Sequence, residues 1–206
     1  MNKETNISMS EQLEIEFKNM LTASEYQKLL LYFQAKEKSF FFQENHYYDT
    51  IHEDLKHLRC GLRIRIMPNS AELTLKTPLG DHLLETTDPL SLKTAKELIS
   101  KNSILQTGAV AKKLQSLKVD PDSVQLIGSL KTKRFEKETK DGLFVLDHSF
   151  YGEQTDFELE FETHDADSGE QIFNRFLEVH HLMKRPSKNK IVRMLEAFSL
   201  NSPITD

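Results

Sequence analysis

The chain has 206 residues, of which 38% are apolar and 29% charged, a composition typical of a soluble globular protein with its own core. Its formal net charge of −5 argues against a general binder of nucleic acid or of anionic membranes, which would be basic overall. Cys60 is the single cysteine, so an internal disulfide is excluded and a reducing cytoplasm is the expected location. The first ten residues are polar, and no apolar run approaches the about 20 residues that span a bilayer, so neither a secretory signal nor a membrane span is expected.

The first half of the chain consists mainly of segments that predict β-strands. Residues 11–20 alternate apolar and polar side chains, and the leucines between Ser24 and Phe33 predict a helix with Thr22 as its N-cap. Residues 51–58 predict a short helix or turn. Turn residues separate the other apolar runs. We therefore expect four further strands, over residues 40–50, 61–67, 72–77 and 82–87.

The middle of the chain changes character before the strands return. Periodic Leu, Ile and Ala positions between Leu90 and Leu117 predict two helices, broken near Thr107-Gly108. A loop is expected at Pro121-Asp122, and Asp141-Gly142 is a strong hairpin signal. We expect the later strands over residues 124–139, 143–150 and 156–163, and the later helices over residues 170–181 and 191–198.

The number and spacing of these strands predict the fold. About eight strands in two groups are joined largely by short turns, which favour antiparallel pairing. Eight strands is the size at which a closed barrel can hold one small ligand. The strand count therefore favours an α+β fold with a closed barrel of that size. The expected organisation is a flexible N-terminus over residues 1–10, one domain over 11–198 with a helical segment at about 90–118, and a tail over 199–206.

Charged side chains alternate with apolar ones along several strands. Glu14, Glu16 and Lys18 share one face of the first strand, because successive side chains in a strand point to opposite faces. The same alternation gives two guanidinium groups at Arg63 and Arg65. It also groups Glu72, Thr74 and Lys76 on one face, and Glu158, Glu160 and Glu162 on another. Residues 131–134 carry basic side chains on both faces, with Lys131 and Lys133 on one and Arg134, beside Thr132, on the other. The pattern leaves open which of them point inward.

For any single strand, a solvated outer face is the ordinary explanation of such alternation. Here the charges are sorted by strand, acidic at 14–16 and 158–162 and basic at 63–65 and 131–134. Paired arginines also suit bidentate recognition of oxyanions. The alternative is a barrel whose charged faces line the cavity. Buried charges must be paired or bound to ions, and a metal-bound polyphosphate would meet both the carboxylates and the cations.

These residues resemble the signatures of the CYTH superfamily, the triphosphate tunnel metalloenzymes, and in particular its bacillus-type members. Glu14-Ile15-Glu16-Phe17-Lys18 is similar to the Glu-x-Glu-x-Lys signature of that family. The later resemblances follow in the family's order along residues 11–195. They are Tyr47-Tyr48-Asp49-Thr50, Leu62-Arg63-Ile64-Arg65, Leu73-Thr74-Leu75-Lys76, Glu85, Arg134, Asp147, Glu158-Leu159-Glu160, and the late lysines Lys188 and Lys190.

The resemblance implies an α+β fold, an eight-stranded antiparallel β-barrel that forms a tunnel with helices packed on its outside. It also implies a set of site residues and a cofactor, Mg²⁺ or Mn²⁺. Metal binding would fall to Glu14, Glu16, Glu158 and Glu160. Phosphate binding would fall to Lys18, Arg63, Arg65, Lys76, Arg134, Lys188 and Lys190. Glu16, Glu85 and Asp147 are the implied catalytic residues, which position the metal or orient water.

The function that follows is a metal-dependent triphosphatase acting on a small soluble triphosphate, such as inorganic triphosphate, thiamine triphosphate or a nucleoside triphosphate. In this scheme a metal-activated water attacks the terminal phosphorus. The first alternative is an adenylate cyclase that makes cyclic AMP and pyrophosphate from ATP. The second is a regulatory module that binds polyphosphate or a nucleotide with little turnover. The partner is a small molecule rather than a membrane or a nucleic acid, and a homodimer is left open.

Overall fold

The computed structural model describes residues 10–200. The predicted flexible N-terminus over residues 1–10 and the tail over 199–206 therefore lie almost entirely outside the described residues. None of the helices in the described range is long and apolar enough to cross a membrane.

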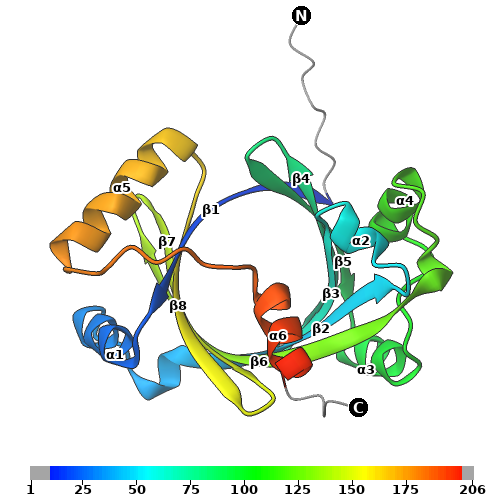
Figure 1. Cartoon of the computed structure of the whole chain (residues 1–206), viewed down its shortest axis with the longest axis horizontal. Coiled ribbons are helices and arrows are strands. Elements are labelled where there is room, and N and C mark those ends of the chain that lie inside the picture. The colour runs from blue at the N-terminus through cyan, green and yellow to red at the C-terminus, as the bar shows by residue number, and fades with distance from the viewer. Residues whose placement is uncertain (1–9, 201–206) are drawn as a thin grey trace, which may run out of the picture. The chain divides into compact units, whose positions relative to one another are not determined.

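Within residues 10–200, eight strands form a closed barrel in the order β1-β5-β4-β3-β2-β6-β7-β8 (Figure 1). This confirms the predicted closed antiparallel barrel, with helices on the apolar faces of its strands and the C-terminal helix on the charged face. Consecutive strands pair through short hairpins, for example Thr139 opposite Gly142 between β6 and β7. The strands are β1 Glu11–Leu21, β2 Phe40–Thr50, β3 Gly61–Ile66, β4 Ala71–Leu79, β5 His82–Leu90, β6 Val124–Thr139, β7 Gly142–Tyr151 and β8 Gln154–Thr163.

The helices begin and end close to the positions that the sequence predicts. They are α1 Ala23–Tyr32, α2 Asp54–His57, α3 Leu92–Ser100, α4 Ala109–Ser116, α5 Ala166–Val179 and α6 Lys190–Leu200. Helix α5 starts four residues earlier than predicted, because the Asp165 side chain accepts a hydrogen bond from the backbone N–H of Ser168 (2.8 Å) and so caps it. Short 3₁₀ turns lie at Glu37–Ser39 and, in the predicted loop, at Pro121–Ser123.

The described chain divides into two compact units. Unit 1 comprises residues 10–14 and 45–127, and unit 2 comprises residues 15–44 and 128–200. The single domain over residues 11–198 stays a prediction.

In unit 1, helices α3 and α4 cover one face of β3 and β4. Leu62, Ile64, Leu73 and Leu75 are fully buried and pack in one cluster with side chains of both helices. Burying each such side chain contributes about 1.5–3 kcal/mol relative to leaving it exposed. The alternation of these strands therefore presents its apolar side to the helices and its charged side to the opposite face.

The predicted break near Gly108 separates α3 from α4. Gly108 has φ of 107°, a conformation that favours glycine. The Asp88 carboxylate accepts hydrogen bonds from the backbone N–H groups of Ala109 (2.9 Å) and Val110 (2.8 Å) and thereby satisfies the start of α4. A Cβ atom at Gly108 would lie 2.6 Å from that carboxylate, so the absence of a side chain permits the cap.

In unit 2, helices α1 and α5 cover the apolar face of β6, β7 and β8. An aromatic-rich cluster that includes Phe135, Phe144, Phe161 and Phe173 forms this core. Thr22 and Glu25 close a capping box at the start of α1, as the predicted N-cap requires. Arg134, Asp147, Glu158 and Glu160 of the same strands lie on the face away from these helices.

Helix α6 lies on the other face of unit 2 from α1 and α5. A Cβ atom on Gly128 of β6 would lie 2.6 Å from Met194 Cε and 3.1 Å from the ring of Phe198. Glycine at position 128 therefore lets α6 approach β6 closely. Figure 1 shows α6 beside β6, on the other side of the strands from α1 and α5.

Candidate metal and phosphate site

The charged face of unit 1 is a network of ion pairs around Lys76. Its ammonium lies 2.6 and 2.5 Å from the two carboxylate oxygens of Glu14 and 3.0 Å from Glu85 Oε1. Arg63 Nη2 lies 3.6 Å from the same Glu85 oxygen. Strand register explains the grouping, since Lys76 of β4 stands directly opposite Glu85 of β5. Carboxylates and cations from four strands, β1, β3, β4 and β5, thus meet on one face.

Arg65 extends this network along β3. Its Nε donates a hydrogen bond to Asn45 Oδ1 (3.1 Å), and Nη1 lies 3.4 Å from Glu72 Oε1 on β4. Burial alone would raise the pKa of the Glu85 carboxyl, but the charges of Lys76 and Arg63 outweigh burial and lower it. Glu85 is therefore ionised at neutral pH and holds both cations in place.

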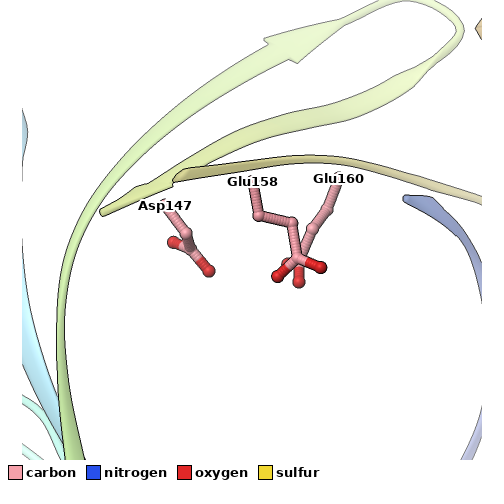
Figure 2. Close-up of side chains that lie close together, drawn as sticks. All are labelled: Asp147, Glu158 and Glu160. Atoms are coloured by element: carbon pink, nitrogen blue, oxygen red, sulfur yellow. The ribbon is translucent and has the colours of Figure 1, made fainter. Parts of the chain in front are cut away.

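Three carboxylates gather on the charged face of unit 2. Asp147 of β7 stands directly opposite Glu158 of β8, and Glu160 follows two residues later on the same face. Each residue offers an oxygen, and these oxygens lie within 4.8 Å of one another. Figure 2 shows the three side chains directed to the same side of the strands. We call this group the acidic trio; Glu158 and Asp147 have no exposed side-chain surface.

Cations from three different elements compensate the acidic trio. Arg134 on β6 donates to Asp147 through Nε (2.8 Å) and Nη2 (2.6 Å), and its Nη2 also donates to Glu160 (2.9 Å). Lys18 on β1 lies 3.6 Å from Glu160 and 2.7 Å from Glu16. The cation that touches all three members is Lys190, at 2.9 Å from Asp147, at 2.5 Å from Glu160 and in contact with Glu158.

Electrostatics keep Asp147, Glu160 and Lys190 charged. Burial disfavours the ionised Glu160, but Lys190, Lys18 and Arg134 outweigh burial and hold its pKa well below the usual range. The pKa of Asp147 is lowered against burial by Arg134 and Lys190. Burial also disfavours the Lys190 ammonium, and the three carboxylates raise its pKa well above the usual value. The arrangement is a buried ionic network at neutral pH.

The C-terminal segment supplies partners that the sequence did not reveal. Ser187 donates a hydrogen bond to Glu158, and Arg193 Nη2 lies 2.8 Å from the same carboxylate. Arg193 Nη1 lies 2.6 Å from Asp156, which also accepts a hydrogen bond from the Tyr151 hydroxyl. Helical spacing gives one signal that could have found Arg193, since Lys190 and Arg193 stand three residues apart on one face of α6.

The remaining basic candidates point elsewhere. Arg134 faces the acidic trio, whereas Lys131 and Lys133 lie on the other face of β6, over the rings of Phe42 and Phe40. This settles which side chains of the basic strand turn inward. Lys188 lies outside the trio, with its ammonium 2.6 Å from Glu196 and both side chains more than half exposed.

The donor chemistry of the acidic trio fits a divalent cation. Mg²⁺ and Mn²⁺ prefer carboxylate oxygens, and the trio brings three of them together from two paired strands. The Lys190 ammonium already lies among these oxygens as an internal cation, which shows that the space between them accepts positive charge. Glu14 and Glu16, the other predicted metal ligands, instead pair with Lys76 and Lys18.

Comparisons with known proteins agree with this architecture. A family model described as the CYTH domain matches residues 12–195. A Bacillus subtilis (strain 168) protein named "Putative triphosphatase YjbK" is 43% identical over 188 residues, which cover 91% of this chain and 97% of that protein.

Two solved structures share the fold. A Bacillus halodurans protein described as "a putative adenylate cyclase" is 32% identical, with a TM-score of 0.86 over 90% of this chain and 98% of its own. The second structure is a Hippeastrum protein, described as a "putative adenylyl cyclase" with "a dominant" triphosphatase activity. It is 19% identical, with a TM-score of 0.72 over 90% of this chain and 95% of its own. At this identity the likeness supports the fold alone. With a domain match over nearly its whole length and a relative of 43% identity, this chain belongs to the CYTH domain family.

Proposed function

We propose that this protein is a Mg²⁺- or Mn²⁺-dependent triphosphatase that hydrolyses a small soluble triphosphate in the cytoplasm. The observation that carries the proposal is the acidic trio, three buried carboxylates within 4.8 Å of one another and surrounded by Arg134, Lys18 and Lys190. Such a combination of hard oxygen ligands and phosphate-binding cations is what a metal-bound polyphosphate requires. The name of the 43%-identical relative supports the same activity.

Asp147, Glu158 and Glu160 would hold the cation, with Glu14 and Glu16 of β1 as further ligands. A divalent cation bound there would neutralise charge on phosphate oxygens in the transition state. Arg134 would fix the orientation of Asp147 and Glu160 through its hydrogen bonds to both. The protein thus contributes a prearranged set of charges, which is the main source of catalysis in phosphoryl transfer.

Phosphate oxygens would be bound by Lys18, Arg63, Arg65, Lys76, Arg134 and Lys190, and Lys188 stays a weaker candidate because of its exposure. In the structure these inward cations pair with carboxylates, for example Lys76 with Glu14 and Glu85. A bound triphosphate would replace some of these carboxylates as the partner of the cations, so that phosphate oxygens take the place of carboxylate oxygens. Glu16, Glu85 and Asp147 would orient the attacking water, which must approach in line with the departing phosphate oxygen.

A cyclase is the second candidate, because the 32%-identical relative is described as "a putative adenylate cyclase". That reaction needs the ribose 3′-hydroxyl to be aimed at the α-phosphorus. The two reactions release different products from ATP. Phosphate and ADP indicate hydrolysis at the terminal phosphorus, whereas pyrophosphate and cyclic AMP indicate cyclisation.

The test is a substrate panel with Mg²⁺ and Mn²⁺ that includes inorganic triphosphate, thiamine triphosphate and ATP, with chromatographic separation of the products. We expect metal-dependent release of phosphate from at least one of them and no cyclic AMP from ATP. Cyclic AMP as the main product would contradict the proposal and show that the protein is an adenylate cyclase. Tight binding of a triphosphate without formation of any product would contradict the proposal and indicate a polyphosphate-binding module.

A further inference from the structure

The acidic trio is filled by one side chain of the C-terminal segment. Arg134 touches two of the three carboxylates and Arg193 touches one, but the Lys190 ammonium touches Asp147, Glu158 and Glu160 together. Its side chain is 11% exposed, so water contributes little to its solvation. Lys190 therefore stands in the position that a divalent cation bound to the same three carboxylates would take.

Two cations cannot share this space. Carboxylate oxygens surround Mg²⁺ at about 2.0–2.1 Å, whereas the ammonium needs its own oxygens at hydrogen-bond distance. A metal held by the trio would lie within a few ångströms of the ammonium, and like charges that close in a buried site repel strongly. Entry of the metal thus requires that Lys190 leave.

Lys190 is also the cation best placed to leave. Arg134 belongs to the middle of β6 and is fixed by a two-point bond to Asp147. Lys190 is the first residue of α6 and follows residues 182–189, which form neither helix nor strand. Ser187, on this connecting segment, is held by Glu158 itself. A metal that engages Glu158 would weaken both contacts at once.

We propose that Lys190 serves as a built-in counter-cation of the metal site, and that a divalent cation displaces it together with the start of α6. The released ammonium then becomes available to bind a phosphate oxygen of the substrate. This inference rests on the proposed metal site, but it concerns binding of the metal without substrate. It can therefore be tested apart from hydrolysis.

The first test measures the affinity of the whole protein for Mn²⁺ alone, by calorimetry or by the loss of the free Mn²⁺ electron spin resonance signal. Lys190→Met removes the competitor, and we expect its dissociation constant to fall by about tenfold or more, because the site no longer has to be vacated first. Lys184→Met is the matched control. Lys184 lies in the same segment, is exposed and contacts the neutral side chain of Asn174, so its variant should bind Mn²⁺ as the wild type does.

The second test uses the wild type and remains valid if Lys190→Met does not fold. Amide hydrogen exchange is compared with and without Mn²⁺, and we expect at least a severalfold faster exchange over residues 186–193 on Mn²⁺ binding, with β7 and β8 unchanged or slower. Equal or weaker Mn²⁺ binding by Lys190→Met, or slower exchange over 186–193 with Mn²⁺, would overturn displacement. Loss of Mn²⁺ binding in both proteins would overturn the metal site as well, whereas the absence of hydrolysis alone would leave displacement intact.

Discussion

Arg134 and Asp147 face each other across β6 and β7 and form a two-point ion pair, with Nε 2.8 Å from Oδ1 and Nη2 2.6 Å from Oδ2. The carboxylate is fully buried, and the guanidinium is almost so. Charges attract strongly in such surroundings, but desolvation costs are large, so neither partner can be lost without leaving the other uncompensated. Arg134 therefore acts first as the residue that positions Asp147 and Glu160.

The first prediction concerns that role. We expect Arg134→Met to lower the free energy of unfolding by about 3–5 kcal/mol, the cost of leaving buried carboxylates without a partner. Arg134→Lys keeps the positive charge but lacks the planar guanidinium with its paired donors. We therefore expect a smaller but measurable decrease in the free energy of unfolding. Urea denaturation at pH 7 measures both. Two variants that unfold like the wild type would contradict the positioning role.

The second prediction concerns the carboxylate of Glu16 on β1. Glu16→Gln keeps the size of the side chain and removes its negative charge, so we expect metal-dependent turnover to be abolished. The neighbouring ammonium of Lys18, 2.7 Å from Glu16, would retain Glu160 as a partner, and the fold should persist. Steady-state phosphate release with Mg²⁺ or Mn²⁺ is the measurement. Full activity in this variant would remove Glu16 from the catalytic residues.

Much of the fold could be predicted from sequence because it depends on local patterns. Alternation along residues 62–66 and 72–76 determines which side chains face the helices, and the buried leucines confirm it. Thr22 and Gly108 mark helix ends by chemistry that acts within a few residues. Strand register is not local, yet hairpins with short turns leave few alternatives.

The rest of the site depends on contacts over long separations. Lys188 and Lys190 are equivalent in the sequence, but the start of α6 directs one to the acidic trio and the other to Glu196. Asp156 looked like the polar start of a strand and is a partner of Arg193. These assignments depend on how the C-terminal segment returns to β8, and no short-range pattern encodes that path.

The third prediction concerns Lys76, which joins Glu14 to Glu85 in unit 1. If Lys76 binds a phosphate oxygen, Lys76→Gln removes a charge-assisted hydrogen bond of about 1.5–3 kcal/mol. We expect KM for the triphosphate to rise by about 10–100-fold. Lys131→Gln is the control, because Lys131 lies on the outer face of β6 beside Phe42 and is half exposed. An unchanged KM in Lys76→Gln would assign Lys76 a purely structural part.

The fourth prediction is a pH dependence of stability. Burial opposes ionisation of Glu160, but Lys190, Lys18 and Arg134 hold its folded-state pKa well below normal. The ionised Glu160 therefore contributes fully to the free energy of unfolding above the carboxyl's pKa in the unfolded chain, about 4.3. This contribution is lost as the pH falls further, because the Glu160 carboxylate of the unfolded chain takes up a proton before that of the folded protein.

The measurement is urea denaturation at pH 5 and at pH 3. When the pH falls from 5 to 3, we expect the free energy of unfolding to decrease by about 1–2 kcal/mol more in the wild type than in Glu160→Gln. This difference arises because the contribution of Glu160 falls by about 1.4 kcal/mol for each pH unit below about 4.3. Glu138→Gln, at an exposed position on β6, controls for the change in net charge. Parallel losses in the wild type and in Glu160→Gln would refute a depressed pKa at Glu160.

The fifth prediction concerns Gly142, which starts β7 after the turn that joins it to β6. Gly142 has φ of 150°, and a Cβ atom there would lie 2.4 Å from the carbonyl oxygen of Glu162 and 2.8 Å from the ring of Phe161. Because the carbonyl belongs to the neighbouring strand, it cannot move aside without disturbing the ladder that carries Asp147 and Glu158. We expect Gly142→Ala to lower the free energy of unfolding by about 1–3 kcal/mol.

Gly61→Ala provides the matched control, since Gly61 also begins a strand but has no atom within 4 Å of its added Cβ. Its effect should stay within about 0.5 kcal/mol. Thermal and urea denaturation of the two variants would separate a steric cost at position 142 from a general cost of losing glycine. If Gly142→Ala were as stable as Gly61→Ala, β7 and β8 would tolerate a backbone shift at this hairpin. The distances within the acidic trio would then not depend on the exact geometry of the hairpin.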